Sequence, residues 1–378
     1  MKLIIDARNL RLYPVGRPGF HGGTETYVKV LAEGLAGKGH TVHVVTPDLD
    51  EDEQRGPSEW WWGPDAHPTK ADAVVMVHSL AGADDYSGDA LVFATNGVDP
   101  DLGPDGRLAE LVAAFPVFSR NHGELMCAQN PTIDKSRCVV TGLGVDVGEY
   151  DGKGWQGGIG QEVYRTGSKV PGRIWVGNDP ARGLWHVLDI FEIVQRETPE
   201  ASLHITYDFD RQFEQHRWRQ NSLAETMREC RSRLKSIPGV VNLGSLDRSG
   251  VITQQLEAMV HLWPSDPPNV GSQIHGLSQA EAASAGCALV LSDIEAFPEI
   301  FGIAATILPV PGRFVPEYER RVDAQDWADA TLELLKDPAK WADASRKARA
   351  LAETLTWSAV VDRWDTMLGM LGAQEKAA

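Results

Sequence analysis

The stretch GLSQAEAASAGCALV, residues 276–290, predicts a short helix of small residues that leads through Gly286 into a buried strand. Glu281 is the one carboxylate on this helix. Burying a carboxylate without a partner is costly, so Glu281 must reach solvent at an ordinary surface or at a cleft, or find a partner inside the protein. The small residues around it favour a ligand-facing role.

The same strand-and-helix alternation continues in both directions from this stretch. Short apolar, β-branched runs alternate with longer segments of helical period, which is the pattern of parallel sheets with crossover helices. The sequence therefore predicts an α/β protein with two doubly wound sheets. The predicted strands are Leu3–Asp6, Val42–Thr46, Ala73–Val77, Ala90–Ala94, Phe115–Ser119, Arg137–Thr141, Arg173–Val176, Ser202–Tyr207, Val240–Leu243, Met259–Trp263, Ala288–Ser292 and Ala305–Leu308.

The length of the chain predicts more than one domain. Its 378 residues exceed the about 250 to 300 residues that one hydrophobic core organises. A glycine-dense segment, Asp151–Gly160, has the composition of a flexible joint and places the boundary there. We expect an N-terminal domain of residues 1–160, a second domain of residues 161–355, and a closing helix of residues 356–378. The clearest earlier helices are Thr24–Lys38 and Leu184–Arg196.

The composition narrows the classes of partner. The net charge of −17 repels polyanions at long range, which disfavours nucleic acid as a bulk partner without excluding it. No apolar run approaches the roughly 18 residues of a membrane span, and the first residues, Met1–Asp6, resemble a buried strand more than a signal segment. We expect a cytoplasmic protein with no integral membrane segment. The four cysteines lack the spacing of a zinc site or a disulfide framework.

Four segments in chain order resemble the retaining glycosyltransferases of the GT-B architecture, glycosyltransferase family 4 in particular. They are Gly22-Gly23 before an amphipathic helix and the following KGHTVHVV; VGNDPARGL, residues 176–184; Glu281–Leu291 followed by Phe297-Pro298-Glu299-Ile300; and Thr356-Trp357-Ser358 with Trp364. The resemblance implies two Rossmann-like doubly wound domains facing a central cleft, with a C-terminal helix that returns to the N-terminal domain.

The resemblance also implies an activity. It is that of a hexosyltransferase-type enzyme that needs neither a cofactor nor a metal ion and that moves a sugar from a nucleotide diphosphate-sugar, UDP- or GDP-linked, with retention of configuration. The nucleotide is expected on the second domain and the acceptor on the first. The acceptor, whether carbohydrate, lipid, small molecule or modified polymer, stays open. The implied donor-binding residues are Gly22, Gly23, Arg182, Gln273, Gly276, Leu277, Ser278 and Glu281.

Four residues are candidates for the chemical step. Arg182 stands near the start of a helix, where a guanidinium and the helix dipole together suit a diphosphate; without the resemblance it is equally an ordinary surface arginine. Gln273 stands where the family carries a glutamate, so it keeps hydrogen bonding but loses the charge. His78 and His122 each follow a strand at the ligand edge of an open sheet, where either catalysis or a structural hydrogen bond fits them.

The acceptor-binding candidates are Asn96 and the aromatic run Trp60, Trp61 and Trp62. Asn96 follows a strand at a point where many relatives carry a histidine. Aromatic faces stack on the C–H faces of sugars, although packing against a loop or a partner subunit explains the tryptophans as well.

Two other hypotheses about the function stay open. A nucleotide-sugar epimerase or a glycoside phosphorylase can use the same fold, because fold does not determine function. The replacements at Gln273 and Asn96 also fit a catalytically degraded protein that only binds sugar.

Overall fold

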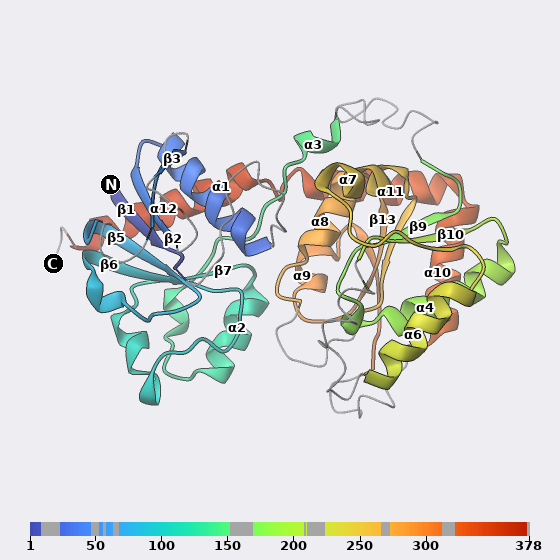
Figure 1. Cartoon of the computed structure of the whole chain (residues 1–378), viewed down its shortest axis with the longest axis horizontal. Coiled ribbons are helices and arrows are strands. Elements are labelled where there is room, and N and C mark those ends of the chain that lie inside the picture. The colour runs from blue at the N-terminus through green and yellow to red at the C-terminus, as the bar shows by residue number, and fades with distance from the viewer. Residues whose placement is uncertain are drawn as a thin grey trace. The chain divides into compact units, whose positions relative to one another are not determined.

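The computed structural model describes residues 1–8, 23–46, 53–55, 58–62, 68–151, 169–207, 209, 224–265, 273–311 and 322–375, and of residues 53–55 and 58–62 it describes the backbone alone. These residues form two compact units (Figure 1). The first comprises Met1–Gly144 and Leu355–Ala378, and the second comprises Val145–Thr354. The glycine-dense joint predicted at Asp151–Gly160 lies, apart from Asp151, outside the described residues.

The first unit is built on a six-stranded sheet in the order β3-β4-β2-β1-β5-β6, in which only β3 is antiparallel to its neighbour. A short parallel pair, β7-β8, continues from β6 through a bridge between Val92 and Ala114. The elements are β1 (Lys2–Asp6), α1 (Gly23–Gly37), β2 (Thr41–Thr46), β3 (Glu53–Arg55), β4 (Ser58–Trp62), β5 (Lys70–Val77), η1 (Ala83–Asp85), β6 (Ser87–Ala94), η2 (Pro104–Leu111), β7 (Phe115–Val117), α2 (Arg120–Gln129), η3 (Lys135–Arg137), β8 (Cys138–Val140) and α12 (Trp357–Glu375).

The second unit is built on a parallel six-stranded sheet in the order β11-β10-β9-β12-β13-β14. Its central strands are buried and mostly apolar, Arg173 on β9 and His261 on β12 being exceptions, which is typical of a sheet covered by helices on both sides. The elements are α3 (Gly148–Asp151), β9 (Arg173–Val176), η4 (Pro180–Arg182), α4 (Leu184–Glu197), β10 (Ser202–Ile205), α6 (Ala224–Ser236), β11 (Val240–Asn242), α7 (Arg248–Glu257), β12 (Val260–Trp263), α8 (Leu277–Ser284), β13 (Ala288–Ser292), α9 (Phe297–Phe301), β14 (Ala305–Leu308), α10 (Ala324–Lys336) and α11 (Pro338–Ala352).

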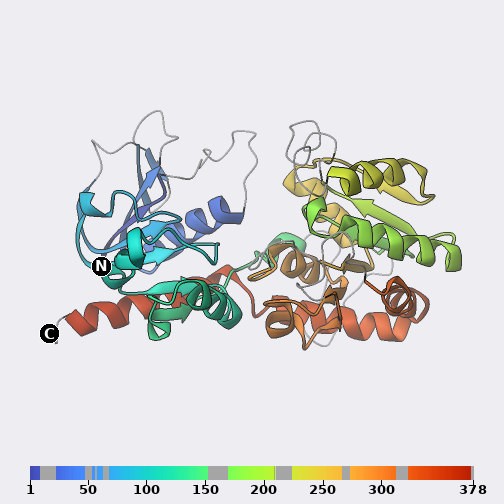
Figure 2. The ribbon, with the colours of Figure 1, turned by 90° about the horizontal axis from the view of Figure 1, so that it is seen from below.

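Helix α12 packs on the first unit, beside α1, although it follows the whole of the second unit in the sequence. In Figures 1 and 2 the red helix lies among the blue and cyan elements of residues 1–144. Its inner face is apolar and fully buried at Val360, Trp364 and Leu368. The predicted return of the C-terminal helix to the N-terminal domain is thereby confirmed.

One part of the sequence prediction is wrong. The run Trp60, Trp61 and Trp62 is absent from the predicted strands, yet it forms the end of β4, which pairs in parallel with β2. The aromatic residues of this five-residue strand have high β propensity. The strand was not predicted because glycines, prolines and charged residues flank it in the sequence.

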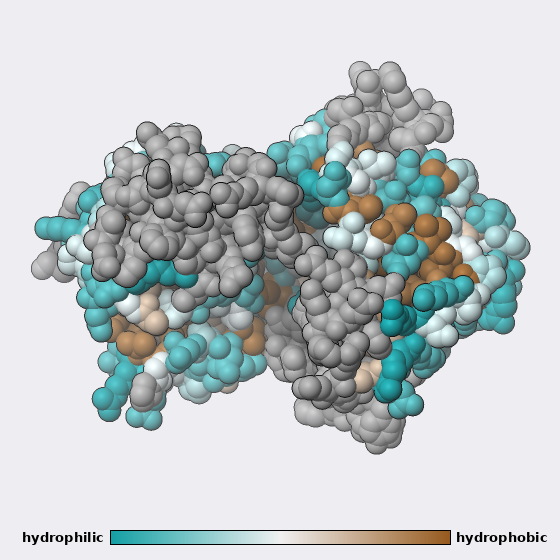
Figure 3. All heavy atoms as spheres, viewed as in Figure 1, coloured by the Kyte–Doolittle hydropathy of each residue, from teal (hydrophilic) through white to brown (hydrophobic). Residues whose placement is uncertain are grey.

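The described surface in Figure 3 is hydrophilic over most of the face in view. Among the described residues, no helix combines the length and the apolar character needed to cross a membrane.

Candidate active site

The second sheet contains a switch point between β9 and β12. The chain runs from β9 outward to β10 and β11, then returns to place β12 on the other side of β9. The connections leaving β9 and β12 therefore diverge at the carboxyl ends of two neighbouring parallel strands, and ligands of open α/β sheets bind in the crevice that this divergence creates. The described residues that follow these strands are 177–183 after β9, and 264–265 and 273–276 after β12.

The loop after β9 places Arg182 at the start of α4. Asp179 accepts a hydrogen bond from the backbone N–H of Ala181 at 3.1 Å, which starts a short 3₁₀ turn ending at Arg182. Gly183 follows with φ 131°, a conformation that favours glycine, and caps the 14-residue helix α4. Arg182 is half-buried. The geometry therefore joins a guanidinium to a helix N-terminus, as a diphosphate site requires.

The loop after β12 places Gln273 at the carboxyl ends of β12 and β13. The side-chain amide of Gln273 donates to Ser265 Oγ at 2.9 Å, and its backbone N–H donates to Glu295 Oε2 at 2.6 Å. Ser292 Oγ donates to the carbonyl oxygen of Ser265 at 2.9 Å. Gln273 is 3% exposed, so its amide is fixed by neighbours of its own chain.

Gly276 lets this loop turn directly into α8. It has φ 101°, and a Cβ there would lie 2.9 Å from the rings of Phe297 and Phe301. Both the backbone conformation and the space therefore require glycine. Leu277 and Ser278, the half-buried first residues of α8, follow it.

Glu281 is paired with an arginine that the sequence analysis did not single out. Glu281 Oε1 accepts from Arg248 Nη1 at 2.6 Å, and the same guanidinium donates from Nη2 to Glu149 Oε2 at 2.5 Å. Burial raises the pKa of Glu281, and the ion pair with Arg248 opposes that rise. Arg248 is the first residue of α7, where a cation opposes the helix dipole. This unfavourable position is the one feature of the sequence that indicates that Arg248 has an acidic partner.

In the first unit the switch point lies between β1 and β5, and His78 follows β5 there. His78 has φ 65°, an uncommon conformation for a residue with a side chain, and such strain is often found at functional sites. Its Nδ1 lies 3.4 Å from Thr95 Oγ1, and burial lowers its pKa. Residues 9–22, including Gly22, lie outside the described residues.

Asn96 stands beside the beginning of α1. Its side-chain amide donates to Thr24 Oγ1 at 3.0 Å, and Gly23, the exposed first residue of that helix, precedes Thr24. Asn96 is itself exposed. The contact brings the loop after β6 to the start of α1.

His122 is completely buried at the start of α2. Its Nδ1 accepts from the backbone N–H of Phe118 at 3.1 Å, so Nε2 carries the proton and donates to the carbonyl oxygen of Gly97 at 3.1 Å. Burial lowers its pKa. Both ring nitrogens are therefore engaged, Nδ1 with Phe118 just after β7 and Nε2 with the turn that follows Asn96.

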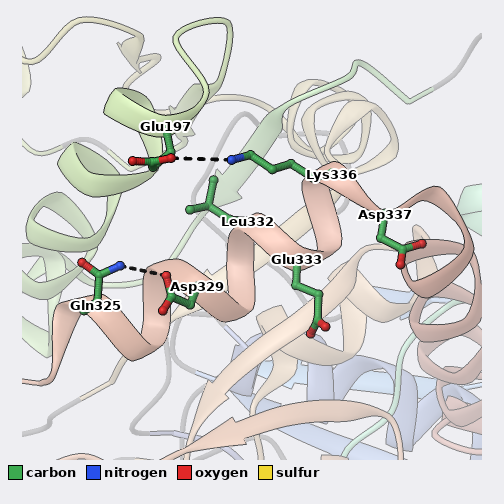
Figure 4. Close-up of a pocket in the computed structure, with 7 residues that line it drawn as sticks. All are labelled: Glu197, Gln325, Asp329, Leu332, Glu333, Lys336 and Asp337. Carbon is green, nitrogen blue, oxygen red and sulfur yellow. Dashed lines mark hydrogen bonds and ion pairs between the residues drawn. The ribbon is translucent and has the colours of Figure 1, made fainter.

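A separate hollow of about 530 Å³ lies along α10 and the end of α4 (Figure 4). Glu197 and Lys336 form an ion pair across it, 3.8 Å apart, and Gln325 donates to Asp329 at 2.8 Å. None of the residues predicted for the site lines this hollow.

No protein-family model matches the sequence, and no curated protein matches it. Solved structures do resemble it. Sucrose-phosphate synthase from Thermosynechococcus elongatus is 15% identical with a TM-score of 0.66, covering 99% of both chains. HepE from Anabaena, solved in complex with UDP and glucose, is 14% identical with a TM-score of 0.64, covering 98% of this chain and 100% of its own.

A third similar structure is that of the trehalose-6-phosphate protein from E. coli bound with UDP-2-fluoro glucose. It is 12% identical with a TM-score of 0.66 and covers 97% of this chain and 99% of its own. These similarities extend over nearly the whole chain and confirm the predicted architecture. The chain has the GT-B fold, the fold of the glycosyltransferases that it resembles.

Proposed function

We propose that this protein is a retaining, metal-independent glycosyltransferase that transfers a sugar from a UDP- or GDP-sugar to an acceptor. The observation that carries the proposal is the switch point between β9 and β12. It places Arg182 and the N-terminus of α4 on one side, and Gln273, Gly276 and the α8 helix bearing Glu281 on the other. The neighbours solved with UDP or a UDP-sugar support a nucleotide-linked donor.

In this proposal, each part of the site has its own role. Glu281 accepts hydrogen bonds from the ribose hydroxyls, and the half-buried backbone at Gly276–Ser278 lies along the diphosphate. Arg182 and the α4 N-terminus meet the charge that grows on the diphosphate as the bond to the sugar breaks, so their effect belongs mainly to the transition state. Gln273 faces the donor sugar.

For the chemical step we propose attack by an acceptor hydroxyl on the face from which the diphosphate departs. The C1–oxygen bond of the donor breaks, the acceptor oxygen bonds to C1, and the hydroxyl proton passes to an oxygen of the leaving diphosphate. This route needs no protein nucleophile. His78 remains a candidate for contact with the reactants, whereas we assign His122 to positioning, because its ring is engaged with Phe118 and Gly97.

The predicted roles of Gly22 and Gly23 at the diphosphate, and of Asn96, Trp60, Trp61 and Trp62 at the acceptor, stay predictions. So does a cytoplasmic location.

A donor screen tests the proposal. UDP, GDP, ADP and TDP are compared for their effect on the melting temperature, and the best nucleotide is then titrated calorimetrically against wild type and Glu281→Gln. The variant should lose roughly tenfold in affinity, since charge-assisted bonds to the ribose are replaced by neutral ones. Glu200→Gln, which changes an exposed glutamate just before the amino end of β10, is the matched control.

The reaction itself is followed with the matching nucleotide sugars, and the anomeric configuration of the product is read by NMR. Inversion would contradict the retaining mechanism. Binding of the nucleotide without transfer or hydrolysis would favour the degraded sugar-binding protein, and absence of any nucleotide binding would overturn the proposal.

A further inference from the structure

A chain of three charged groups crosses three helices in the second unit. Glu149 on α3, Arg248 on α7 and Glu281 on α8 meet at one guanidinium. Arg248 donates to Glu149 Oε2 from Nε at 3.1 Å and from Nη2 at 2.5 Å, and to Glu281 Oε1 from Nη1 at 2.6 Å. One cation therefore serves two carboxylates.

The two carboxylates are unequal in their exposure. The Glu281 side chain is 17% exposed, whereas that of Glu149 is 34% exposed and that of Arg248 is 43% exposed. Glu281 therefore depends more on its partner to stay ionised, because burial penalises the charged form. Arg248 supplies the strongest influence that opposes this penalty.

The other groups around Glu281 give it little further positive charge. Tyr150 on α3 donates its hydroxyl to Gln255 Oε1 at 2.8 Å, and the Gln255 side chain is a polar neighbour of Glu281 on the α7 side. Arg349 on α11 donates hydrogen bonds to the carbonyl oxygen of Ser284 at 2.7 Å and to Asp151 Oδ1 at 2.6 Å. Among these neighbours, Arg248 is the cation that contacts Glu281.

The position of Arg248 does not favour a purely structural role. Its side chain is substantially exposed, and exposed ion pairs contribute little to stability. As the first residue after the N-cap Asp247, it also opposes the dipole of its own helix. An arginine at this position lowers the stability of the helix, and its exposed ion pairs return little. A role in the site therefore explains Arg248 better than a contribution to stability.

We propose that Arg248 is a positioning residue for donor recognition: it keeps Glu281 ionised and fixes Oε1, leaving Oε2 to accept from the ribose hydroxyls. The inference rests on the proposed function, because it deepens the role given to Glu281. Through Glu149 the same guanidinium fastens α3, near the beginning of the second unit at Val145, to the ribose carboxylate.

The test compares two nucleotides that differ only in the ribose. At pH values from 6 to 8.5 we measure two dissociation constants: that of a ribonucleoside diphosphate, GDP or UDP as the donor screen selects, and that of its 2′,3′-dideoxy counterpart. The ratio is the constant of the dideoxy nucleotide divided by that of the ribonucleotide. Both carry the same titrating phosphates, so their ratio isolates what the ribose hydroxyls contribute. In wild type we expect a ratio of about ten or more, flat across this range.

Arg248→Met should change both the size and the pH dependence of the ratio. Without the guanidinium, Glu281 faces Glu149 with no cation between them, and its pKa rises further. Protonation of Glu281 then removes the charged acceptor, so the ratio should fall toward one as the pH is lowered and recover as it is raised. Arg248→Lys should restore most of the ratio, because it returns the charge.

A second arginine provides the matched control. Arg233 bridges Asp189 at 2.7 Å and Glu192 at 3.2 Å, away from the switch point on α6 and α4, and its side chain is 16% exposed. Arg233→Met likewise removes a guanidinium from among carboxylates, since Glu229 also lies 3.9 Å from Arg233 Nη1. It should leave the ratio and its pH profile unchanged, even where it lowers the melting temperature.

The outcomes separate this inference from the proposed function. A wild-type ratio near one, or a ratio that Glu281→Gln leaves intact, removes Glu281 from the ribose and overturns this inference, whereas the proposed function is overturned only by the absence of nucleotide binding in the donor screen. A wild-type ratio that depends on Glu281 but is the same in Arg248→Met at every pH overturns the role of Arg248 alone.

Discussion

Trp364 Nε1 donates a hydrogen bond to the hydroxyl oxygen of Tyr27 at 3.0 Å, joining two side chains that are 337 positions apart in the sequence. Trp364 is fully buried on α12, and Tyr27 is 2% exposed on α1. The rings of Phe118 and Trp357 pack against Tyr27 from other directions. This aromatic cluster attaches the last described helix to the first unit.

Trp364→Phe should therefore destabilise the first unit by about 1–3 kcal/mol, since it removes a buried hydrogen bond and part of a buried ring. Urea unfolding followed by circular dichroism measures the change. Met370→Ala is the control in the same helix, because Met370 is 62% exposed and its removal should cost less than about 0.5 kcal/mol. Equal effects of the two substitutions would mean that the Trp364–Tyr27 contact does not hold α12.

Arg182→Ala should depress turnover more than donor binding. The charge of Arg182 meets a diphosphate that becomes more negative as the bond to the sugar breaks, so kcat should fall roughly a hundredfold while KM changes little. Steady-state kinetics with the donor identified by the screen measure both constants. Arg346→Ala on α11, which removes an exposed arginine paired with Asp343, is the control. A normal kcat with a raised KM would show that Arg182 supplies uniform binding instead.

Gln273→Glu should lower activity or shift the preference among donor sugars. The new carboxylate would be buried beside Ser265, and its backbone N–H already faces Glu295, so a second negative charge would lie close to the first. Turnover against a small panel of nucleotide sugars measures the effect, with the exposed Gln129→Glu as control. A rise from almost no activity would instead identify Gln273 as a mark of lost catalysis.

His261 should make the second unit less stable in mild acid. It is fully buried against Trp175, its Nδ1 donates to the carbonyl oxygen of Trp175 at 3.1 Å, and burial lowers its pKa to about 4. An unfolded histidine titrates near 6.5, so between about pH 6.5 and 4 the unfolded chain binds a proton that the folded one does not. Stability is therefore complete above pH 6.5 and is lost as the pH falls toward 4.

The variant His261→Gln should lack this loss. Comparing urea unfolding at pH 7 and pH 4.5, we expect the decrease in the free energy of unfolding to be about 2–3 kcal/mol smaller in the variant than in wild type. An identical decrease in both proteins would show that His261 does not titrate in this way.

Local sequence patterns were sufficient for most of the fold. Runs such as Ala288–Ser292 and Ala305–Leu308 are apolar, β-branched and bounded by turns, and they form strands at those same residues. The missed strands, Glu53–Arg55 and Ser58–Trp62, are short and lie in polar surroundings, where hydrophobic periodicity gives no signal.

The candidate site was less accessible to sequence reasoning. Glu281 was singled out because a lone carboxylate on a helix of small residues must reach solvent or find a partner. The partner that it has, Arg248, is 33 positions away, and Glu149 is 99 positions from Arg248. Which distant side chains meet is decided by packing of α3, α7 and α8. The left-handed backbone conformation of His78 likewise depends on tertiary contacts, and the residue type alone does not predict it.

The placement of α12 also sets an order of events during synthesis. Domains of a growing chain usually fold as they emerge, the N-terminal one first. Here the first unit lacks Trp364 and Leu368 of its own core until the 210 residues of Val145–Thr354 have been translated. The first unit is therefore the later of the two to be completed, and a chain that ends between Thr354 and Trp357 has a complete second unit joined to a first unit with an open apolar face.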